Sequence, residues 1–210
     1  MANLTDLTSK EFLTELASAA PAPGGGGGAA MAGALAAALS SMVCNLTLGK
    51  ERFAAQEAEV ESVLVKAERA RERLLELVQE DAAVFNSFMS CYKLPKATDE
   101  EKAARTAAIR AAAKKAAEVP LAIARESFAV LELADELVVC GNPGVITDGA
   151  CSGLLARAAL RCAEYNVRIN LGLTKDAEWN AQVQAELEAM LTQAEALEAK
   201  LLAVTDKALA

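Results

Sequence analysis

The sequence contains no histidine among its 210 residues. A serine–histidine–aspartate triad, a histidine-ligated zinc site and an imidazole proton shuttle are therefore excluded from this chain. Asp and Glu side chains are then the natural candidates for acid–base chemistry, with Lys as an alternative. Aromatic residues make up only 4% of the chain. We therefore expect a core made by close contacts between small and aliphatic side chains.

The chain also lacks any Cys-X-X-Cys pair, and its five cysteines are scattered. An odd, scattered set is typical of reduced thiols, so we expect a cytoplasmic protein. The N-terminal segment carries Asp6, Lys10 and Glu11 instead of the basic start of a signal peptide. The uncharged stretch 16–49 is long enough to cross a membrane. Its Ala, Gly and Ser residues are only weakly apolar, so we expect a buried helix and no membrane partner.

The formal net charge is −8, with no cluster of basic residues. Nucleic-acid binding depends on clustered Lys and Arg side chains, so a nucleic-acid partner is not expected. The acidic balance is mildly favourable for a cationic small molecule. Nothing in the sequence indicates a metal site or a redox cofactor.

The composition and periodicity predict an all-α fold in one domain over residues 1–210. Ala, Glu, Leu, Lys and Arg are abundant, and no segment shows the alternation of a strand. Capping-box spacings at Thr8–Glu11 and Thr98–Glu101 mark two helix starts. The predicted antiparallel bundle has helices over 9–19, 29–48, about 50–94, 99–140 with a kink or break at Pro120, 147 or 148 to 171 with a stop at Gly172, and 176 to the C-terminus.

The stretch 21–48 begins with Pro-Ala-Pro and five consecutive glycines and continues as a run of small residues. We expect a glycine loop at 24–28, which could bind a ligand or serve only as a flexible linker. No Gly-Lys-Ser/Thr follows and no strand precedes, so the loop is neither a Walker loop nor a dinucleotide fingerprint. The following helix is apolar nearly all round, which indicates that a second copy of the chain completes the core.

Asp81 lies on the apolar stripe of the predicted helix 50–94, in register with Leu74, Val78 and Phe85. Burying a carboxylate costs several kcal/mol unless it is paired or hydrogen-bonded. Asp81 is therefore either a member of a buried ion pair or a carboxylate in a pocket between helices.

Other polar residues admit both structural and functional interpretations. Asn166 and Asn170 lie one turn apart on one helix face, where two poor helix formers need polar partners. Asn142 falls in a predicted turn, and Asp148 could serve as a helix N-cap. The remaining two candidates, Lys96 and Arg105, flank a proline link and by default are solvated charges.

Together these stretches resemble the formiminotetrahydrofolate cyclodeaminase/methenyltetrahydrofolate cyclohydrolase family. The motifs run through most of the chain and are specific in their order, although each is weak alone. Two departures are Gly27, where the family usually has serine, and Thr147, which replaces a serine before the aspartate. The matching segments are Pro21–Gly26 with its small-residue helix, Met42–Thr47, Asp81–Phe85, Leu94–Lys96, Glu101–Arg105, Gly141–Asn142, Thr147–Asp148 and Asn166–Leu171.

The resemblance implies a homodimer or higher oligomer with a tetrahydrofolate derivative as substrate and no cofactor. The implied reaction is hydrolysis of 5,10-methenyltetrahydrofolate to 10-formyltetrahydrofolate. It requires a positioned water, a base for that water and a proton for N5. We assign these roles to Asp81 and Asp148 without dividing them, with Lys96 as an alternative. The expected substrate-binding residues are Gly24, Gly25, Gly26, Arg105, Asn142, Asn166 and Asn170.

Two other functions stay open on the sequence. A cyclodeaminase, which releases ammonia from 5-formiminotetrahydrofolate, would use much the same cleft. The chain lacks the formiminotransferase domain that is fused in the animal bifunctional proteins, which favours the cyclohydrolase. A non-enzymatic helical scaffold would explain the amphipathic helices but would leave Asp81 and the paired asparagines without a role.

Overall fold

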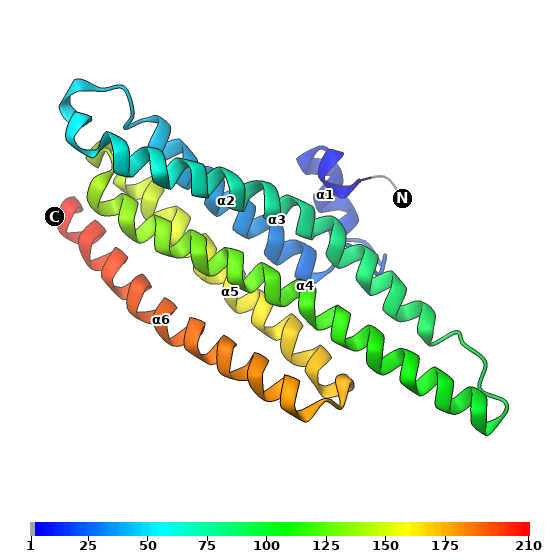
Figure 1. The fold of residues 1–210 in the computed structure, drawn as a ribbon. Helices are drawn as coiled ribbons and strands as arrows, with labels where there is room; N and C mark the ends of the chain where they lie inside the picture. Colours follow the sequence, from blue (N-terminus) through cyan, green and yellow to red (C-terminus); the bar gives the residue numbers. More distant parts are fainter. Residues whose placement is uncertain (1–2) are drawn as a thin grey trace.

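A computed structural model describes residues 3–210, and these form an all-α bundle (Figure 1). The predicted fold class is confirmed, and no strand occurs in the described part of the chain. Met1 and Ala2, which belong to the predicted domain 1–210, lie outside the described residues. The α-helices are α1 (Ser9–Leu16), α2 (Gly25–Asn45), α3 (Glu57–Cys91), α4 (Asp99–Cys140), α5 (Ile146–Thr174) and α6 (Ala177–Leu209). Short 3₁₀ turns are η1 (Leu4–Asp6), η2 (Glu51–Gln56) and η3 (Pro143–Val145).

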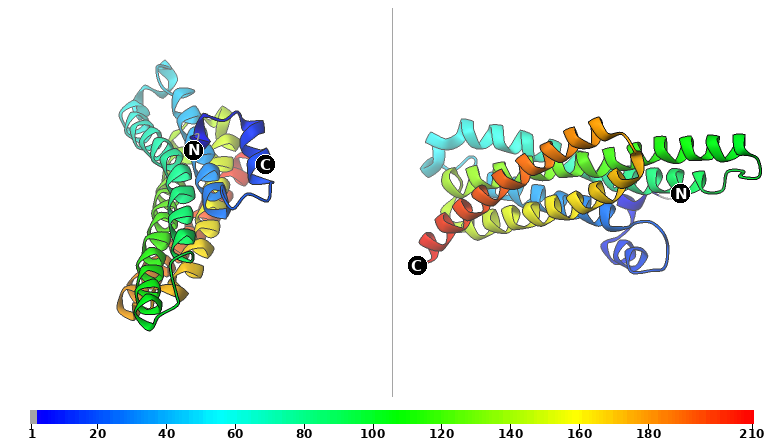
Figure 2. Two further views of the ribbon diagram at one scale, coloured as in Figure 1. Left: turned by 90° about the vertical axis from the view of Figure 1, so that its right-hand side faces the viewer. Right: turned by 90° about the horizontal axis from the view of Figure 1, so that it is seen from below.

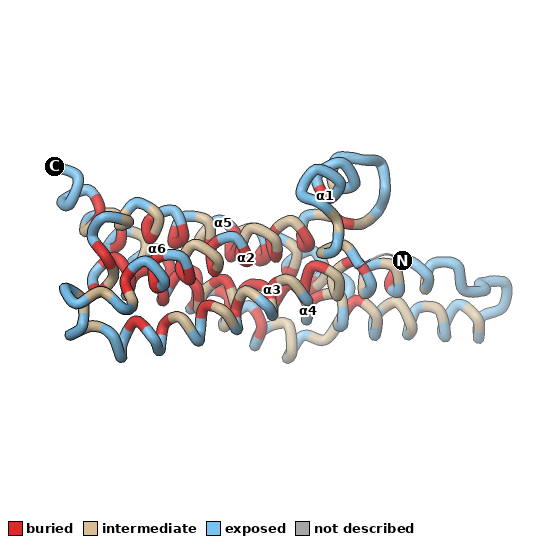
Figure 3. Tube along the Cα trace, turned by 90° about the horizontal axis from the view of Figure 1, so that it is seen from above, coloured by how far each residue is buried: buried red, intermediate tan, exposed pale blue. Residues whose placement is uncertain are grey.

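Helix α2 is the central element, because it packs against α3, α4 and α5. Its small residues allow these helices to approach closely. A Cβ at Gly33 would lie 2.9 Å from Ser127 Oγ and 3.1 Å from a Leu74 methyl carbon. Ala29, Gly33 and Ala37 are among the buried residues of α2, and Figure 3 shows the buried positions of the bundle concentrated where the helices face one another. Helix α6 covers α4 and α5 on another side of the bundle.

The apolar composition of α2 is that of a core helix. Among residues 3–210 it is the one helix whose length and mean hydropathy of 1.5 would suit a membrane span. However, 61% of the relevant window is buried inside the bundle. This burial supports the expected core helix.

Both predicted capping boxes are present at the helix starts. Thr8 accepts a hydrogen bond from the Glu11 N–H, and Thr98 accepts one from the Glu101 N–H, each with the reciprocal glutamate contact. Each box satisfies two backbone donors at a helix start, so these two boundaries could be read from the sequence.

Several other boundaries were predicted wrongly. The glycine run is not a loop before a helix at 29, because α2 begins at Gly25. Residues 50–94 are not one helix, because η2 precedes α3. Helix α5 begins at Ile146 after an N-cap residue, Val145, that makes no side-chain cap, so neither Thr147 nor Asp148 is the cap. It also continues through Gly172 and ends at Thr174, and the C-cap residue Lys175 has a left-handed φ of 58°.

The predicted kink or break at Pro120 does not end α4, which continues for 42 residues as one helix. The distal parts of α3 and α4 extend past the other helices as a projecting hairpin (Figures 1 and 2). The part of α3 and α4 where this hairpin leaves the bundle forms one wall of a cavity at the N-terminal end of α2.

Candidate active site between α2, α3, α4 and α5

A cavity of about 390 Å³ lies at the N-terminal end of α2. This volume is within the range of small-molecule sites. Helices α3, α4 and α5 form its other walls, so residues far apart in the sequence meet there. The lining residues are Pro21, Ala22, Gly24, Gly25, Gly26, Asp81, Val84, Phe85, Phe88, Ala116, Pro120, Asn166, Ile169, Asn170 and Leu173.

The Asp81 carboxylate lies against the first turn of α2. The backbone N–H of Gly27 donates a hydrogen bond to Asp81 Oδ2 at 2.9 Å. A Cβ at Gly26 would lie 2.7 Å from the Asp81 carboxyl carbon and 2.8 Å from Oδ2. The absence of a side chain at Gly26 is therefore what allows the carboxylate to reach the helix end.

Asp81 makes no ion pair in the described part of the chain, so the buried ion-pair interpretation is not supported. It is also the one ionisable residue among the described residues that line the cavity. Burial raises the pKa of Asp81 above its ordinary value, and the Gly27 hydrogen bond partly opposes that shift. The positive end of the α2 dipole further favours a negative charge at this position. The result is an isolated carboxyl group in a mostly apolar cavity.

Asn166 presents a hydrogen-bond acceptor to the cavity. Its Nδ2 donates to the Cys162 carbonyl one turn back at 2.8 Å. This contact fixes the amide group and leaves Oδ1 available. A Cβ at Gly25 would lie 3.4 Å from Asn166 Nδ2, so a side chain there would crowd the amide.

Asn170 connects α5 to α4 at the point where α4 contains a proline. Pro120 has no N–H, so the Ala116 carbonyl four residues earlier lacks its helical donor. Asn170 Nδ2 donates to that carbonyl at 3.0 Å and to the Asn166 carbonyl at 2.8 Å. The side chain therefore supplies the missing donor and helps α4 to pass through Pro120 unbroken.

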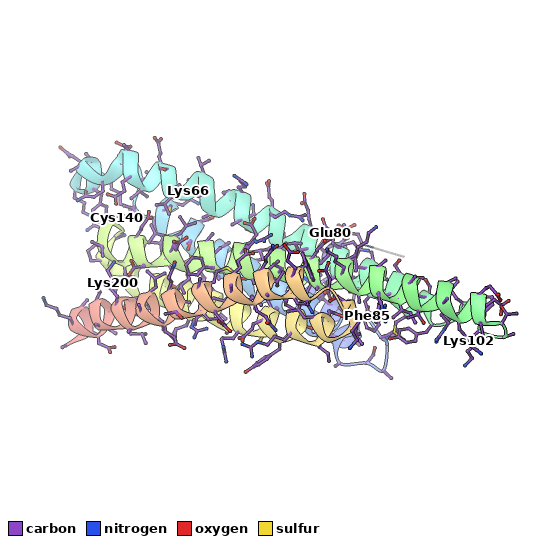
Figure 4. All side chains as sticks on the ribbon, turned by 60° about the horizontal axis from the view of Figure 1, so that its bottom comes forward. Lys66, Glu80, Phe85, Lys102, Cys140 and Lys200 are labelled. Atoms are coloured by element: carbon purple, nitrogen blue, oxygen red, sulfur yellow. The ribbon has the colours of Figure 1, made fainter. Side chains whose placement is uncertain are left out.

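Asn142 lies outside the cavity lining, at the end of the bundle where α4 finishes. Figure 4 shows that end, marked by Cys140, far from Phe85 in the cavity. The Asn142 N–H donates to Thr47 Oγ1 at 2.9 Å, its Nδ2 donates to the Leu46 carbonyl, and its Oδ1 accepts from the Gly144 N–H. These contacts hold the end of α2 to the α4–α5 connection.

Asp148 lies in the first turn of α5, at this same distant end. It is partly exposed, and no hydrogen bond or ion pair joins its side chain to another residue of the described 3–210. The single chain therefore does not bring the two predicted catalytic carboxylates together.

Lys96 and Arg105 belong to the projecting α3–α4 hairpin, whose tip is marked by Lys102 in Figure 4. Lys96 is exposed in the connection. The Arg105 guanidinium donates to the Tyr92 carbonyl and lies 5.5 Å from the Tyr92 ring centre. Neither residue lines the cavity, and the contacts of Arg105 stabilise the hairpin.

The apolar walls of the cavity are not among the site residues that the sequence predicts. Phe85 belongs to the predicted apolar stripe, yet it is 37% exposed and lies one turn beyond Asp81. Ile169 stands between the two asparagines and is 72% exposed. Such exposure of large apolar side chains beside polar groups is typical of a ligand site, but the periodicity alone cannot reveal it. No group of three or more Cys, Asp or Glu residues within 3–210 is arranged to hold a metal ion.

The family model for formiminotransferase-cyclodeaminase matches residues 8–189. The chain belongs to this family. The resemblance drawn from the sequence motifs is thereby confirmed, together with a family relation to enzymes named for tetrahydrofolate substrates.

The relatives include both activities considered above. The chain is 45% identical to a methenyltetrahydrofolate cyclohydrolase of Methylorubrum extorquens, over 90% of this chain and 91% of that protein. It is 33% identical to the formimidoyltransferase-cyclodeaminase of Sus scrofa, but spans only 34% of that longer protein. A solved structure of a formiminotetrahydrofolate cyclodeaminase from Thermotoga maritima matches with a TM-score of 0.88, 28% identity and coverage of 99% and 100%.

Proposed function

We propose that this family member is a methenyltetrahydrofolate cyclohydrolase, which hydrolyses 5,10-methenyltetrahydrofolate to 10-formyltetrahydrofolate. The observation that carries the proposal is the single carboxyl group, Asp81, in an otherwise uncharged cavity. The full-length similarity to a protein of that name favours this reaction over the alternatives.

Asp81 suits the electrostatic demands of this reaction. The substrate carries a delocalised cation over N5, the bridging carbon and N10, and a carboxylate in an apolar cavity attracts such a cation. Phe85 and Phe88 provide apolar surface for flat rings, and the Asn166 oxygen can accept from the amino and ring N–H groups of the pterin. The bare backbone at Gly24–Gly26 allows a ring to approach the wall closely.

The chemistry then requires two proton transfers. A water oxygen forms a bond to the bridging carbon while Asp81 accepts a proton from that water. The hydroxyl proton of the tetrahedral adduct then leaves, N5 gains a proton, and the bond between the carbon and N5 breaks. The products are the N10 formyl group and one released proton. The raised pKa of Asp81 brings it closer to the solution pH, as a group that accepts and returns a proton requires.

The alternative is a cyclodeaminase, favoured by the fold match to a protein of that name. The purified protein should be given methenyltetrahydrofolate and formiminotetrahydrofolate separately while the methenyl absorbance is followed. Loss of absorbance faster than spontaneous hydrolysis supports the proposal, and gain from the formimino compound supports the deaminase. No enzyme-dependent change in absorbance with either substrate would favour a non-enzymatic helical scaffold.

We further propose that the protein acts in the cytoplasm as a homodimer or higher homo-oligomer without a cofactor. The scattered cysteines, all five of which are free thiols, are compatible with a reducing compartment. Exposed large apolar side chains on α2 and α5, such as Leu35 and Ile169, support self-association.

A further inference from the structure

Asn170 is held in one orientation at the wall of the cavity. Its Nδ2 group has two hydrogens, and both are donated to backbone carbonyls, one to Ala116 on α4 at 3.0 Å and one to Asn166 on α5 at 2.8 Å. Turning the amide over would point its oxygen at two carbonyl oxygens, which repel it. The side chain also lines the cavity, so the group that it can offer a ligand is its oxygen. Asn170 is therefore a fixed hydrogen-bond acceptor.

Asn166 provides a second acceptor one helical turn away. Its Nδ2 donates to the Cys162 carbonyl at 2.8 Å, and its side chain lines the same cavity. Side chains four residues apart on a helix have Cβ atoms about 5–6 Å apart. Helix α5 thus presents two amide oxygens in a row, which suit the edge of a flat ligand that carries two N–H donors.

Asp81 lies across the cavity from the two asparagines. Helices α2 and α4 each pack against both α3, which carries Asp81, and α5. The first turn of α2 lies between the two polar groups. A Cβ at Gly25 would lie 3.4 Å from Asn166 Nδ2, whereas a Cβ at the next residue, Gly26, would meet the Asp81 carboxylate. A flat ring in the cavity would therefore have the carboxylate at one edge and the asparagine oxygens at the other.

The pterin ring of the proposed substrate has polar groups that match this arrangement. N5, which carries the methenyl carbon, and N8 are on opposite sides of the same ring. The edge that contains N8 has two N–H donors, the N8–H and the 2-amino group. A ring whose N5 faces Asp81 therefore turns these two donors towards α5.

The aromatic side chains indicate which donor meets which asparagine. Helices α3 and α5 both run towards the projecting hairpin, so Phe85 lies nearer the hairpin than Asp81, and Asn170 lies nearer to it than Asn166 (Figure 1). The benzoyl ring of a folate is attached at the end of the pterin where N8 lies, away from the 2-amino group. If that ring packs on Phe85, the N8–H faces Asn170 and the 2-amino group faces Asn166.

We propose that Asn170 selects reduced pterins by accepting a hydrogen bond from N8–H. The inference rests on the proposed function for the class of ligand. N8 carries a hydrogen in dihydro- and tetrahydropterins, whereas in a fully oxidised pterin it has a lone pair that would face the Asn170 oxygen. Because the amide cannot turn over, the site cannot adapt to the oxidised ring. An oxidised folate should therefore bind roughly 10–100-fold more weakly than a reduced one.

Folic acid and 7,8-dihydrofolate are a matched pair of ligands for the test. Their rings have the same N5 and differ only in the hydrogens at N8 and C7. Isothermal titration in oxygen-free buffer measures the affinity of each ligand without turnover. We expect the wild type to bind dihydrofolate roughly 10–100-fold more tightly than folic acid. Equal affinities, or no measurable binding of dihydrofolate, would overturn the proposal.

Two variants test whether the selection depends on Asn170. Asn170→Ala removes the acceptor for N8–H, so the two ligands should bind with similar affinity. Asn166→Ala is the matched control, because it removes the acceptor for the 2-amino group, which both ligands carry. Both should bind more weakly to this control, with the preference for dihydrofolate retained. A preference that persists in Asn170→Ala, or that disappears in Asn166→Ala, would overturn the assignment.

Asn170 also supports α4, so a second comparison separates binding from folding. Pro120→Ala returns a backbone N–H to the Ala116 carbonyl, which no longer needs the asparagine. Asn170→Ala should therefore also be measured in the Pro120→Ala background, next to Pro120→Ala alone. Selection that is present in Pro120→Ala and absent from the double variant supports the role of Asn170. Equal selection in both proteins would overturn it.

Assays of turnover distinguish this inference from the proposed function. A wild type that converts neither folate substrate, but prefers dihydrofolate through Asn170, would refute only the proposed function. A wild type that hydrolyses methenyltetrahydrofolate, but binds dihydrofolate and folic acid equally, would refute only the selection by Asn170.

Discussion

The Asp81 carboxyl group occupies the space that a Cβ at Gly26 would fill, at 2.7 Å from its carboxyl carbon. The next residue, Gly27, donates its N–H to the same carboxylate. The glycine run is thus part of a helix whose first turn is in direct contact with the candidate base.

We predict that Gly26→Ala abolishes most of the activity, because the new methyl group must displace the Asp81 carboxylate. A loss of about 100-fold or more in kcat/KM is expected for a misplaced general base. Gly28→Ala is the matched control, because a Cβ there would meet only a Leu16 methyl carbon at an ordinary 3.9 Å. The control should keep its activity and gain roughly 0.5–1 kcal/mol in stability from better helix propensity. Equal activities of the two variants in a steady-state assay would contradict this prediction.

Asp81→Asn should reduce hydrolysis by about 10²–10⁴-fold, the usual contribution of a general base. The asparagine oxygen can still accept from the Gly27 N–H, so the helix start is retained. Stopped-flow absorbance of the methenyl substrate measures the effect. Near wild-type hydrolysis in a folded variant would remove Asp81 from the role of base.

The stability of Asp81→Asn relative to the wild type should depend on pH. Burial raises the folded-state pKa of Asp81, so the wild type gains stability from its protonated form at low pH and loses it as the pH rises through that pKa. The variant does not lose stability in this way, because asparagine stays neutral at every pH of the experiment. The variant should therefore melt higher than the wild type at pH 7, and the difference should shrink as the pH falls. Thermal melts between pH 4 and 8 would show it; a difference that grows towards acid pH would contradict it.

Asn170 should be energetically coupled to Pro120. Asn170→Leu leaves the half-buried Ala116 carbonyl without a donor, which should cost about 1 kcal/mol, the low end for an unsatisfied polar group. Pro120→Ala restores a backbone N–H to that carbonyl, so the asparagine should matter less in its presence. Urea unfolding of both single variants and the double variant measures the coupling. Strictly additive effects would show that the Asn170 contact does not compensate for the proline.

The sequence predicted the features that depend on local chemistry. The capping boxes at Thr8 and Thr98, the all-α class and the apolar stripe of α3 follow from short-range hydrogen bonding and periodicity. The stripe also identified Asp81, because a carboxylate in that register required an explanation. These features can be predicted without knowing which residues of another helix lie beside them.

The errors occurred where a distant residue changed the local preference. Glycine is a poor helix former, yet the run at 25–28 is helical because Asp81, 54 residues away from Gly27, accepts its backbone donor. Pro120 does not break α4 because Asn170 on another helix supplies a donor. The positions of Asn142 and Asp148 at the far end of the bundle could not be read from spacing alone, since they depend on how α2, α4 and α5 align.

The glycine start of α2 also has a consequence for how the protein opens. Each glycine in a helix costs about 0.8–1.0 kcal/mol relative to alanine, and the first turn of α2 has no side-chain cap. The Asp81 carboxylate therefore stabilises the first turn of α2 by accepting the Gly27 N–H, and the same hydrogen bond fixes the position of the carboxylate. If Asp81 is the base, fraying of this turn and loss of the candidate catalytic centre are a single event, so the stability of the first turn of α2 sets the fraction of molecules that are competent to react.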